Sequence, residues 1–225
     1  MNYKSIAIDG PSGAGKSTLA KMLAEKLGFL YVDTGAIYRT VGLCAFQNHV
    51  ASTDTQGVTA LLETIEIDLR HGGDGLQHMY LGGADVTEEI RRHEISKYAS
   101  DVSAMPAVRA FLLDMQRSLA RTHNVIMDGR DIATVVLPKA DVKLFLTASP
   151  EIRAERRYLE LKEKGSAADF ETVLSDLKQR DFNDSTRAEA PLRQAEDAIL
   201  VDTTDYTLEE SFRVMLELIR ERLAT

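Results

Sequence analysis

The sequence has 225 residues, of which 44% are hydrophobic, enough for one large core with small appendages. Its formal net charge of -8 argues against non-specific binding to nucleic acid. A single cysteine, Cys44, excludes an internal disulfide and a zinc site built from cysteines. The sequence contains no signal-peptide run and no apolar segment of membrane-spanning length, so we expect a cytoplasmic protein that binds no membrane.

The first predicted elements are an apolar strand over residues 5–9, a glycine-rich turn, and a helix that Gly28 ends. The turn has the G-x-x-x-x-G-K-[ST] spacing of a phosphate-binding loop. Its glycines allow the backbone to bend around an anion and to point N–H groups inward at the positive end of the helix. Lys16 would then reach the β- and γ-phosphates, and the Ser17 hydroxyl would bind a magnesium ion. The residues predicted to bind the nucleoside triphosphate are Gly10, Pro11, Ser12, Gly13, Ala14, Gly15, Lys16, Ser17 and Thr18.

A second apolar strand, residues 29–32, completes a βαβ unit and is followed by Asp33-Thr34-Gly35-Ala36-Ile37-Tyr38-Arg39. In a parallel sheet this segment would lie at the carboxyl ends of the strands, where ligands bind. Thr34, Tyr38 and Arg39 are therefore candidates for holding a second, anionic substrate. The alternative is structural: Thr34 caps a helix, Tyr38 belongs to the core and Arg39 is solvated.

In the middle of the chain, after residue 40, the predicted elements no longer alternate as in a βαβ unit. Residues 40–50 are predicted to be helical, and strand-like pieces at 65–69 and 76–81 follow, separated by glycine turns. Antiparallel strands without intervening helices do not suit a doubly wound core, so they predict a small inserted sheet. A helical segment over 87–104 and a helix opened by Pro106 come next.

The run Val125-Ile126-Met127-Asp128 is predicted to be a buried strand that ends in a carboxylate, the arrangement by which phosphate-loop enzymes hold a magnesium shell. Asp128 would act on the metal together with Ser17, or it would orient loop residues; the sequence leaves both roles open. Arg130 and Asp131 follow after one glycine. A cation and an anion at the end of a central strand exceed what a structural loop requires, so we interpret both as functional.

Three arginines lie on the next predicted helix, which follows a strand at 142–147 and begins with a serine cap and a proline. Arg153, Arg156 and Arg157 are three and four residues apart and share one helical face. Such cations would close over a triphosphate as a lid, neutralising charge and excluding water. The alternative is a solvated basic face paired with neighbouring glutamates.

The last third of the chain adds a second group of charged residues. Arg180, Asp184 and Arg187 are spaced to share one face near the end of a predicted helix. A strand at 198–202 and a terminal amphipathic helix with a capping box at 207–210 complete the predicted fold.

With these motifs in place, the sequence resembles the bacterial cytidylate kinases over essentially the whole chain. The resemblance depends on the strand-rich insertion and on the segments 9–17, 33–39, 128–131 and 180–187. It implies one α/β domain over residues 1–225, with a parallel sheet of P-loop NTPase type flanked by helices. Within this domain it implies a small NMP-binding insertion at about 63–104 and a helical lid at about 150–168.

The resemblance implies an enzyme that transfers the γ-phosphate of ATP to CMP or dCMP with Mg²⁺ as cofactor. We expect a monomer without a nucleic-acid partner. The alternatives are another P-loop small-molecule kinase, acting on UMP, AMP or shikimate, and a non-catalytic nucleotide sensor. A GTPase-like switch is disfavoured because no Asn-Lys-x-Asp guanine motif occurs.

Individual roles also follow from the resemblance. The catalytic residues would be Lys16, Arg130, Arg157 and Arg187, and Arg156 with Arg157 would add to the ATP-binding loop. Magnesium would be held through Ser17 and Asp128. The residues that would bind CMP are Thr34, Tyr38, Arg39, Ser100, Arg109, Arg130, Asp131, Arg180, Asp184 and Arg187.

Base recognition has a physical reason beside the resemblance. Cytosine offers an amine donor and a ring-nitrogen acceptor where uracil offers an oxygen acceptor and an N–H donor. The carboxylate of Asp131 and the guanidinium of Arg109 match cytosine, and with uracil each would face the wrong partner. Because the acceptor phosphate is already an anion, the expected mechanism needs positioning and charge neutralisation without a strong general base.

Overall fold

The computed structural model describes residues 3–73, 75–163, 165 and 167–224. The chain divides into two compact units, of which unit 1 comprises Met1–Leu30 and His123–Thr225 and unit 2 comprises Tyr31–Thr122. Each unit contains a β-sheet and helices of its own. Within the described residues, no helix is both long enough and apolar enough to cross a bilayer.

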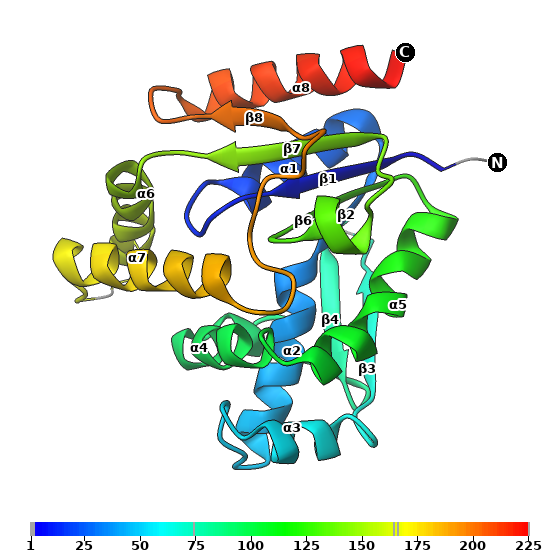
Figure 1. Cartoon of the computed structure of the whole chain (residues 1–225), viewed down its shortest axis with the longest axis vertical. Helices are drawn as coiled ribbons and strands as arrows, with labels where there is room; N and C mark the ends of the chain where they lie inside the picture. Colours follow the sequence, from blue (N-terminus) through cyan, green and yellow to red (C-terminus); the bar gives the residue numbers. More distant parts are fainter. Residues whose placement is uncertain (1–2, 74, 164, 166, 225) are drawn as a thin grey trace. The chain divides into compact units, whose positions relative to one another are not determined.

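Unit 1 is built on parallel strands in the order β6-β1-β7-β8 (Figure 1). Their bounds are β1 (Ser5–Asp9), β6 (Val125–Gly129), β7 (Val142–Thr147) and β8 (Ile199–Asp202). Ile8 in β1 lies opposite Asp128 of β6 and Leu144 of β7. The central strands are apolar along nearly their whole length because both faces of a parallel sheet are covered. This arrangement confirms the predicted parallel sheet flanked by helices.

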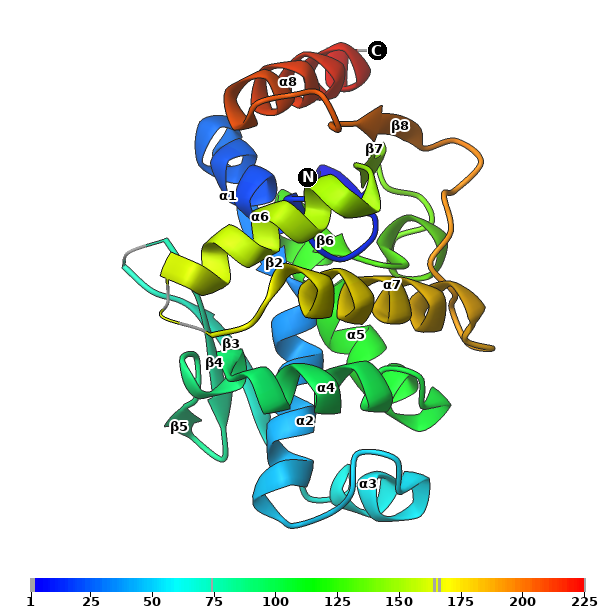
Figure 2. The ribbon, with the colours of Figure 1, turned by 90° about the vertical axis from the view of Figure 1, so that its left-hand side faces the viewer.

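The α-helices of unit 1 lie where local sequence signals predict them, whereas the short π-helix of this unit was not predicted. They are α1 (Lys16–Leu27), α6 (Pro150–Glu163), α7 (Phe170–Thr186) and α8 (Leu208–Ala224), and the π-helix η2 spans Ile132–Val136. The predicted capping box is confirmed, because the Glu210 carboxylate accepts the Thr207 N–H at 2.9 Å and the Thr207 hydroxyl accepts the Glu210 N–H at 3.2 Å. Figures 1 and 2 show α6 and α7 lying side by side.

Unit 2 combines an antiparallel sheet in the order β3-β4-β5 with a group of helices. The chain enters it through β2 (Leu30–Asp33). Its helices are α2 (Thr34–Gln47), α3 (Thr55–Leu61), the 3-10 helix η1 (Glu89–Arg91), α4 (His93–Val102) and α5 (Pro106–Thr122). Its sheet consists of β3 (Ile67–His71), β4 (Gln77–Leu81) and β5 (Ala84–Asp85). The small antiparallel sheet was expected, whereas α3 was not.

Helix α2 is the central element of unit 2, and α4 packs across it (Figure 2). The crossing is close at Gly42, where an added Cβ would lie 3.0 Å from the backbone nitrogen of Ala99. This packing explains why the compact unit extends beyond residues 63–104 on both sides. The predicted binding role of 63–104 stays a prediction.

Several predicted boundaries differ from the structure. The helix predicted at 40–50 begins at Thr34, because the Asp33 carboxylate caps it by accepting the Ala36 N–H at 2.9 Å. The strand predicted at 65–69 is shifted to Ile67–His71. The helix predicted at 87–104 is interrupted at Arg92, whose extended backbone (φ -61°, ψ 148°) separates η1 from α4.

Candidate active site

The phosphate loop connects β1 to α1 in the conformation that the glycine spacing predicts. Gly10 has a φ of +148°, and a Cβ there would lie only 1.9 Å from the carbonyl oxygen of Leu146. Gly15 has a φ of +85° where α1 begins. Only glycine satisfies the close approach at Gly10 without displacing β7. The loop residues 10–18 therefore bring their backbone N–H groups to the amino end of a helix, the arrangement that binds anions.

Lys16 is almost buried in this loop, with 6% of its surface exposed. Its Nζ donates a hydrogen bond to the carbonyl oxygen of Pro11 at 2.7 Å. Burial lowers the pKa of Lys16 well below its ordinary value, the positive charge of Arg130 lowers it further, and the carboxylates of Asp128 and Asp9 oppose both effects. A polyanion bound in the loop would favour the charged ammonium group, so Lys16 fits the role of a phosphate ligand.

Ser17 and Asp128 were predicted as the magnesium site, and the structure brings them together. The Ser17 hydroxyl donates to a carboxylate oxygen of Asp128 at 2.8 Å. Asp128 is 4% exposed and lies in β6. Both side chains offer hard oxygen atoms, which suit Mg²⁺, and Mg²⁺ bound to nucleotides needs only one or two protein ligands besides phosphate and water. The hydrogen bond fits either role left open for Asp128.

An ion-pair network follows β6, and we call it the arginine–aspartate cluster. Its members are Arg130, Asp131, Asp184 and Arg187. The Nε of Arg130 donates to Asp184 at 2.8 Å, and Arg187 lies 3.5 Å from Asp131 and 3.9 Å from Asp184. Arg187 also donates to the carbonyl oxygen of Ala190 at 2.6 Å and 2.8 Å, which fixes the orientation of its guanidinium group.

The positive charges around the cluster lower the pKa of one of its carboxylates, that of Asp184. Burial raises the pKa of Asp184, but the positive charges of Arg130, Arg180 and Arg187 outweigh that effect and bring the pKa below its ordinary value. Arg180, predicted to contact the ribose, lies one helical turn before Asp184 on α7. A guanidinium group has five N–H donors in a planar arrangement that suits the oxygen atoms of a phosphate.

The three arginines of α6 differ in environment, although they share a helix. Arg153 is 4% exposed and donates to the carbonyl oxygen of Ser12 at 2.8 Å and to Asp181 at 2.6 Å. Arg156 donates to the carbonyl oxygen of Thr203 at 2.8 Å. Arg157 is half-exposed and donates to Glu160 at 2.8 Å, as the solvated alternative predicts for that residue. The ATP contacts of Arg156 and Arg157 stay predictions.

Five of the residues predicted to bind CMP lie in unit 2. Two of them lie beside Asp33, the residue that caps α2: Thr34 is 3% exposed, and the guanidinium group of Arg39 donates to the Asp33 carboxylate at 2.8 Å. The structural alternative for this segment is wrong on two points, because Asp33 rather than Thr34 is the cap and Arg39 is paired and largely buried. The Nε of Arg39 is buried and has no hydrogen-bond partner among the described residues, as a donor for an anionic ligand would.

The residues of unit 2 that are predicted to contact the cytosine base lie around Tyr38. Arg109 is stacked over the Tyr38 ring with 5.4 Å between its Cζ and the ring centroid. It also donates to the carbonyl oxygen of Ser103 at 3.0 Å, and the Ser103 hydroxyl donates to the carbonyl oxygen of Ser100 at 2.8 Å. These contacts place Tyr38, Ser100 and Arg109 in one neighbourhood of unit 2.

Three residues of the site were not predicted from the sequence. Asp9 accepts hydrogen bonds from the two backbone N–H groups that follow Asp131 in the chain. Asp181 accepts the N–H of Ser12 at 3.3 Å. Gln77 pairs with the backbone of Asp33 through both ends of its amide, at 2.8 Å and 3.1 Å. Only Asp9 had a local signal, since it directly precedes the phosphate loop. The partners of Asp181 and Gln77 are distant in sequence.

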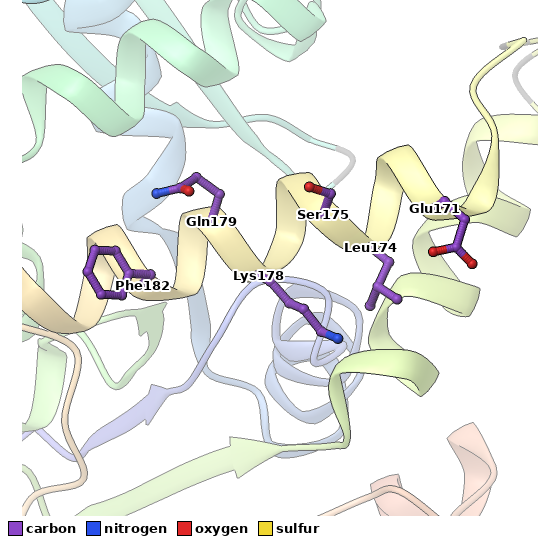
Figure 3. A pocket seen from close by; sticks show the side chains of 6 residues that line it. All are labelled: Glu171, Leu174, Ser175, Lys178, Gln179 and Phe182. Carbon is purple, nitrogen blue, oxygen red and sulfur yellow. The ribbon is translucent and has the colours of Figure 1, made fainter.

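A pocket on the surface of α7 is lined by none of the residues described above. Figure 3 shows six side chains lining it, and all of them come from this single helix. They are Glu171, Leu174, Ser175, Lys178, Gln179 and Phe182. None of them was predicted as a site residue, so the pocket adds nothing to the candidate site.

Known proteins resemble this chain over nearly its whole length. The sequence model of the family described as cytidylate kinase matches residues 6–221. A cytidylate kinase from Caldicellulosiruptor bescii is 51% identical over 218 residues, which are 97% of this chain and 96% of that protein. A cytidylate kinase from Carboxydothermus hydrogenoformans is 50% identical over 214 residues, covering 95% of this chain and 96% of that one.

Among solved structures, an uncharacterized protein from Eubacterium ventriosum has a similar fold, with a TM-score of 0.50 at 13% identity over 98% of both chains. That likeness concerns the fold alone. The match of the family model over nearly the whole chain, together with relatives at about half identity, establishes the assignment. This chain belongs to the cytidylate kinase family.

Proposed function

We propose that this protein is a (d)CMP kinase that transfers the γ-phosphate of ATP to CMP or dCMP, giving ADP and CDP or dCDP. Its membership of the cytidylate kinase family supports the reaction. The observation that carries the proposal is the pairing, within unit 1, of a complete phosphate loop with the arginine–aspartate cluster. One part suits a triphosphate, and the other suits a second phosphate.

On the donor side, the backbone N–H groups of the loop and the ammonium group of Lys16 would bind the phosphates of ATP. Ser17 and Asp128 would hold Mg²⁺, which supplies positive charge to the β- and γ-phosphate oxygens when it is bound. Arg153 already anchors the loop through the Ser12 carbonyl oxygen, so it would support the loop rather than contact the nucleotide. Arg156 and Arg157 would add positive charge over ATP from α6.

On the acceptor side, Arg130 and Arg187 would bind the phosphate of CMP, because planar guanidinium groups match its oxygens in pairs. Asp184 and Arg180 would bind the ribose, and Asp131 would accept the exocyclic amine of cytosine. The residues of unit 2 proposed to contact CMP are Thr34, Tyr38, Arg39, Ser100 and Arg109.

The reaction needs no strong base, since the attacking phosphate oxygen is already negatively charged. Lys16, Arg130, Arg157 and Arg187 would align that oxygen with the γ-phosphorus and stabilise the charge that spreads over the transferred group. The ion pairs of Arg130 and Arg187 with Asp184 and Asp131 hold both guanidinium groups in place before substrate binds, which reduces the reorganisation that the reaction requires.

The experiment compares ADP production with CMP, dCMP, UMP, AMP and shikimate as acceptors, at saturating ATP and Mg²⁺. We expect rapid turnover with CMP and dCMP and slow turnover with the other three. Comparable or faster turnover with UMP would refute the assignment of Asp131 and Arg109. Nucleotide binding without transfer to either cytidine nucleotide would refute the kinase proposal and favour a nucleotide sensor.

We also propose that the protein acts as a monomer in the cytoplasm, where ATP and CMP are available, without a nucleic-acid or membrane partner. Light scattering after size-exclusion chromatography tests the first point, and a stable dimer would contradict it.

A further inference from the structure

The residue that reads the base in our proposal occupies an unusual position. Asp131 is the N-cap residue of η2, a π-helix of five residues, yet its side chain makes no capping hydrogen bond. An aspartate at an N-cap normally accepts a hydrogen bond from one of the next N–H groups of its own helix. Short π-helical segments are rare and are frequently found at functional sites. Something else must therefore satisfy the first N–H groups of η2.

Asp9, the last residue of β1, supplies the cap from another strand. Its two carboxylate oxygens accept the N–H groups of Ile132 and Ala133, each at 2.8 Å. Asp9 is 1% exposed, so water does not compete for these hydrogen bonds. Gly10 of the phosphate loop follows Asp9 directly. One buried carboxylate thus joins the start of the phosphate loop to the turn that contains Arg130 and Asp131.

This cap has a consequence for Asp131. Because Asp9 satisfies the helix, the carboxylate of Asp131 is not required for capping and lies 3.5 Å from Arg187 in the arginine–aspartate cluster. Burial raises the pKa of Asp9 to about 6 in spite of its two hydrogen bonds, with the nearby Asp131 acting in the same direction and Lys16 against it. A buried carboxylate is an unfavourable choice for stability alone when Asp131 stands where a cap would form.

We propose that Asp9 is a positioning residue for the acceptor nucleotide: by capping η2 from β1, it keeps the carboxylate of Asp131 available for the cytosine and holds Arg130 toward the acceptor phosphate. This inference depends on the proposed function, because it deepens the same site. Asp9 is buried and both of its carboxylate oxygens accept backbone N–H groups, so it would not contact a substrate itself. Its removal would therefore affect the use of CMP much more than the binding of ATP.

The first test is Asp9→Asn, which keeps the shape and one acceptor oxygen but turns an amide N–H₂ toward the second backbone N–H. We expect kcat/KM for CMP to fall about tenfold to a hundredfold, since a hydrogen bond to a charged group is lost. The CMP-over-UMP preference should fall by at least about threefold, and KM for ATP should change by less than about threefold. An equal change for both substrates, or no change, would overturn the proposal.

Asp141→Asn is the matched control. Asp141 also accepts a backbone N–H of β1, that of Ser5 at 2.9 Å, but at the opposite end of the strand from the phosphate loop. A general weakening of β1 would therefore affect both variants alike. We expect Asp141→Asn to lower the melting temperature without altering the CMP-over-UMP preference. A loss of preference in this control would overturn a specific role for Asp9.

A double-substitution cycle separates positioning from support of the fold. If Asp9 acts on base selection through Asp131, then adding Asp9→Asn to Asp131→Ala should change the CMP-over-UMP preference by less than about twofold. A full additional loss in the double variant would show that Asp9 acts by another route and would overturn the proposal.

Amide hydrogen exchange of the unsubstituted protein tests the proposal even if the Asp9→Asn variant does not fold. We expect CMP to slow amide hydrogen exchange at Ile132 and Ala133 by at least about tenfold, because a ligand stabilises the elements that bind it. The N–H of Ser5 should not respond. Unchanged exchange at Ile132 and Ala133 with CMP bound would overturn the inference, whereas an unsubstituted protein that does not phosphorylate CMP would instead refute the proposed function.

Discussion

The phosphate loop and the arginine–aspartate cluster both place cations in unit 1, but they are assembled in different ways. The loop is one continuous segment whose conformation follows from its glycines, with Lys16 held against Pro11 only five residues away. The cluster joins the end of β6 to the end of α7, so that Arg130 meets Asp184 across 54 residues of sequence. A local motif determines the first region, whereas the tertiary fold determines the second.

The largest expected effect belongs to the loop. Lys16→Ala should lower kcat by about 1,000-fold or more, because the ammonium group stabilises charge on the transferred phosphate. The fold should persist, since burial already disfavours the charged form of Lys16 and, among the described residues, its Nζ donates one hydrogen bond, to the Pro11 carbonyl oxygen. Kinetics and thermal unfolding of the same sample test both statements.

Lys26→Ala is the control for this prediction, because Lys26 lies in the last turn of the same helix and is exposed. It should retain full turnover. If Lys16→Ala kept near-normal turnover, the loop would lose its role in the mechanism, and the contrast with the cluster would disappear.

The next largest effect is on the pH dependence of stability, and it comes from Asp9, which joins the phosphate loop to the turn that contains Arg130 and Asp131. Its pKa is raised from 3.8 to about 6 in the folded protein, so between these values the folded state retains a proton that the unfolded state has released. Stability must then fall as pH rises through that window, by on the order of 3 kcal/mol in total. Urea unfolding of the unsubstituted protein and Asp9→Asn from pH 4 to pH 7 measures this difference.

Asp141→Asn again provides the comparison, because the pKa of Asp141 is shifted in the opposite direction and its effect on stability appears below the measured range. Burial raises the pKa of Asp141, but hydrogen bonds from Lys4 and Ser5 outweigh it and bring the pKa below its ordinary value. Its contribution is therefore present above pH 3.8 and is lost as pH falls further. Stability is a better readout here than turnover, because the phosphate of CMP also titrates near pH 6. Parallel stability curves for Asp9→Asn and the unsubstituted protein would contradict the raised pKa.

The same contrast between local motifs and contacts made by the tertiary fold explains which features could be predicted from the sequence. The strands of unit 1, the loop over residues 10–18 and the capping box at Thr207 were predictable because their signals are contiguous. Helix η2 was not predicted, since Ile132–Val136 reads as an apolar run and its cap comes from Asp9, on another strand. Likewise, Thr34 looked like a helix cap, although Asp33, just before it, fills that position.

Side-chain environment was harder to predict than element type. Arg153 and Arg157 have the same helix, charge and predicted face. Arg153 is buried against the Ser12 carbonyl oxygen, whereas Arg157 is half-exposed beside Glu160. Helical spacing gives the face on which a residue lies, but the partner across that face comes from distant parts of the chain.

A smaller effect is expected on the preference for CMP over UMP when the arginine–aspartate cluster is altered. Asp131→Ala should lower the CMP-over-UMP preference by about 30-fold, because a carboxylate accepts from the amine of cytosine and repels the oxygen of uracil. KM for ATP should stay within about twofold if the loop is assembled independently of the cluster. Steady-state kinetics with both acceptors measures the ratio. An unchanged preference would move base reading to other residues, such as Arg109.

The smallest expected effect separates the two interpretations of the α6 arginines. Arg157→Ala should change the free energy of unfolding by less than about 0.5 kcal/mol, because its ion pair with Glu160 is half-exposed. If Arg157 closes over ATP, kcat should nevertheless fall about tenfold. Glu160→Ala is the matched control, since it breaks the same ion pair and keeps the cation, and it should leave kcat unchanged. Equal and negligible effects of the two substitutions would assign Arg157 to a solvated basic face and confine the catalytic cations to Lys16 and the arginine–aspartate cluster.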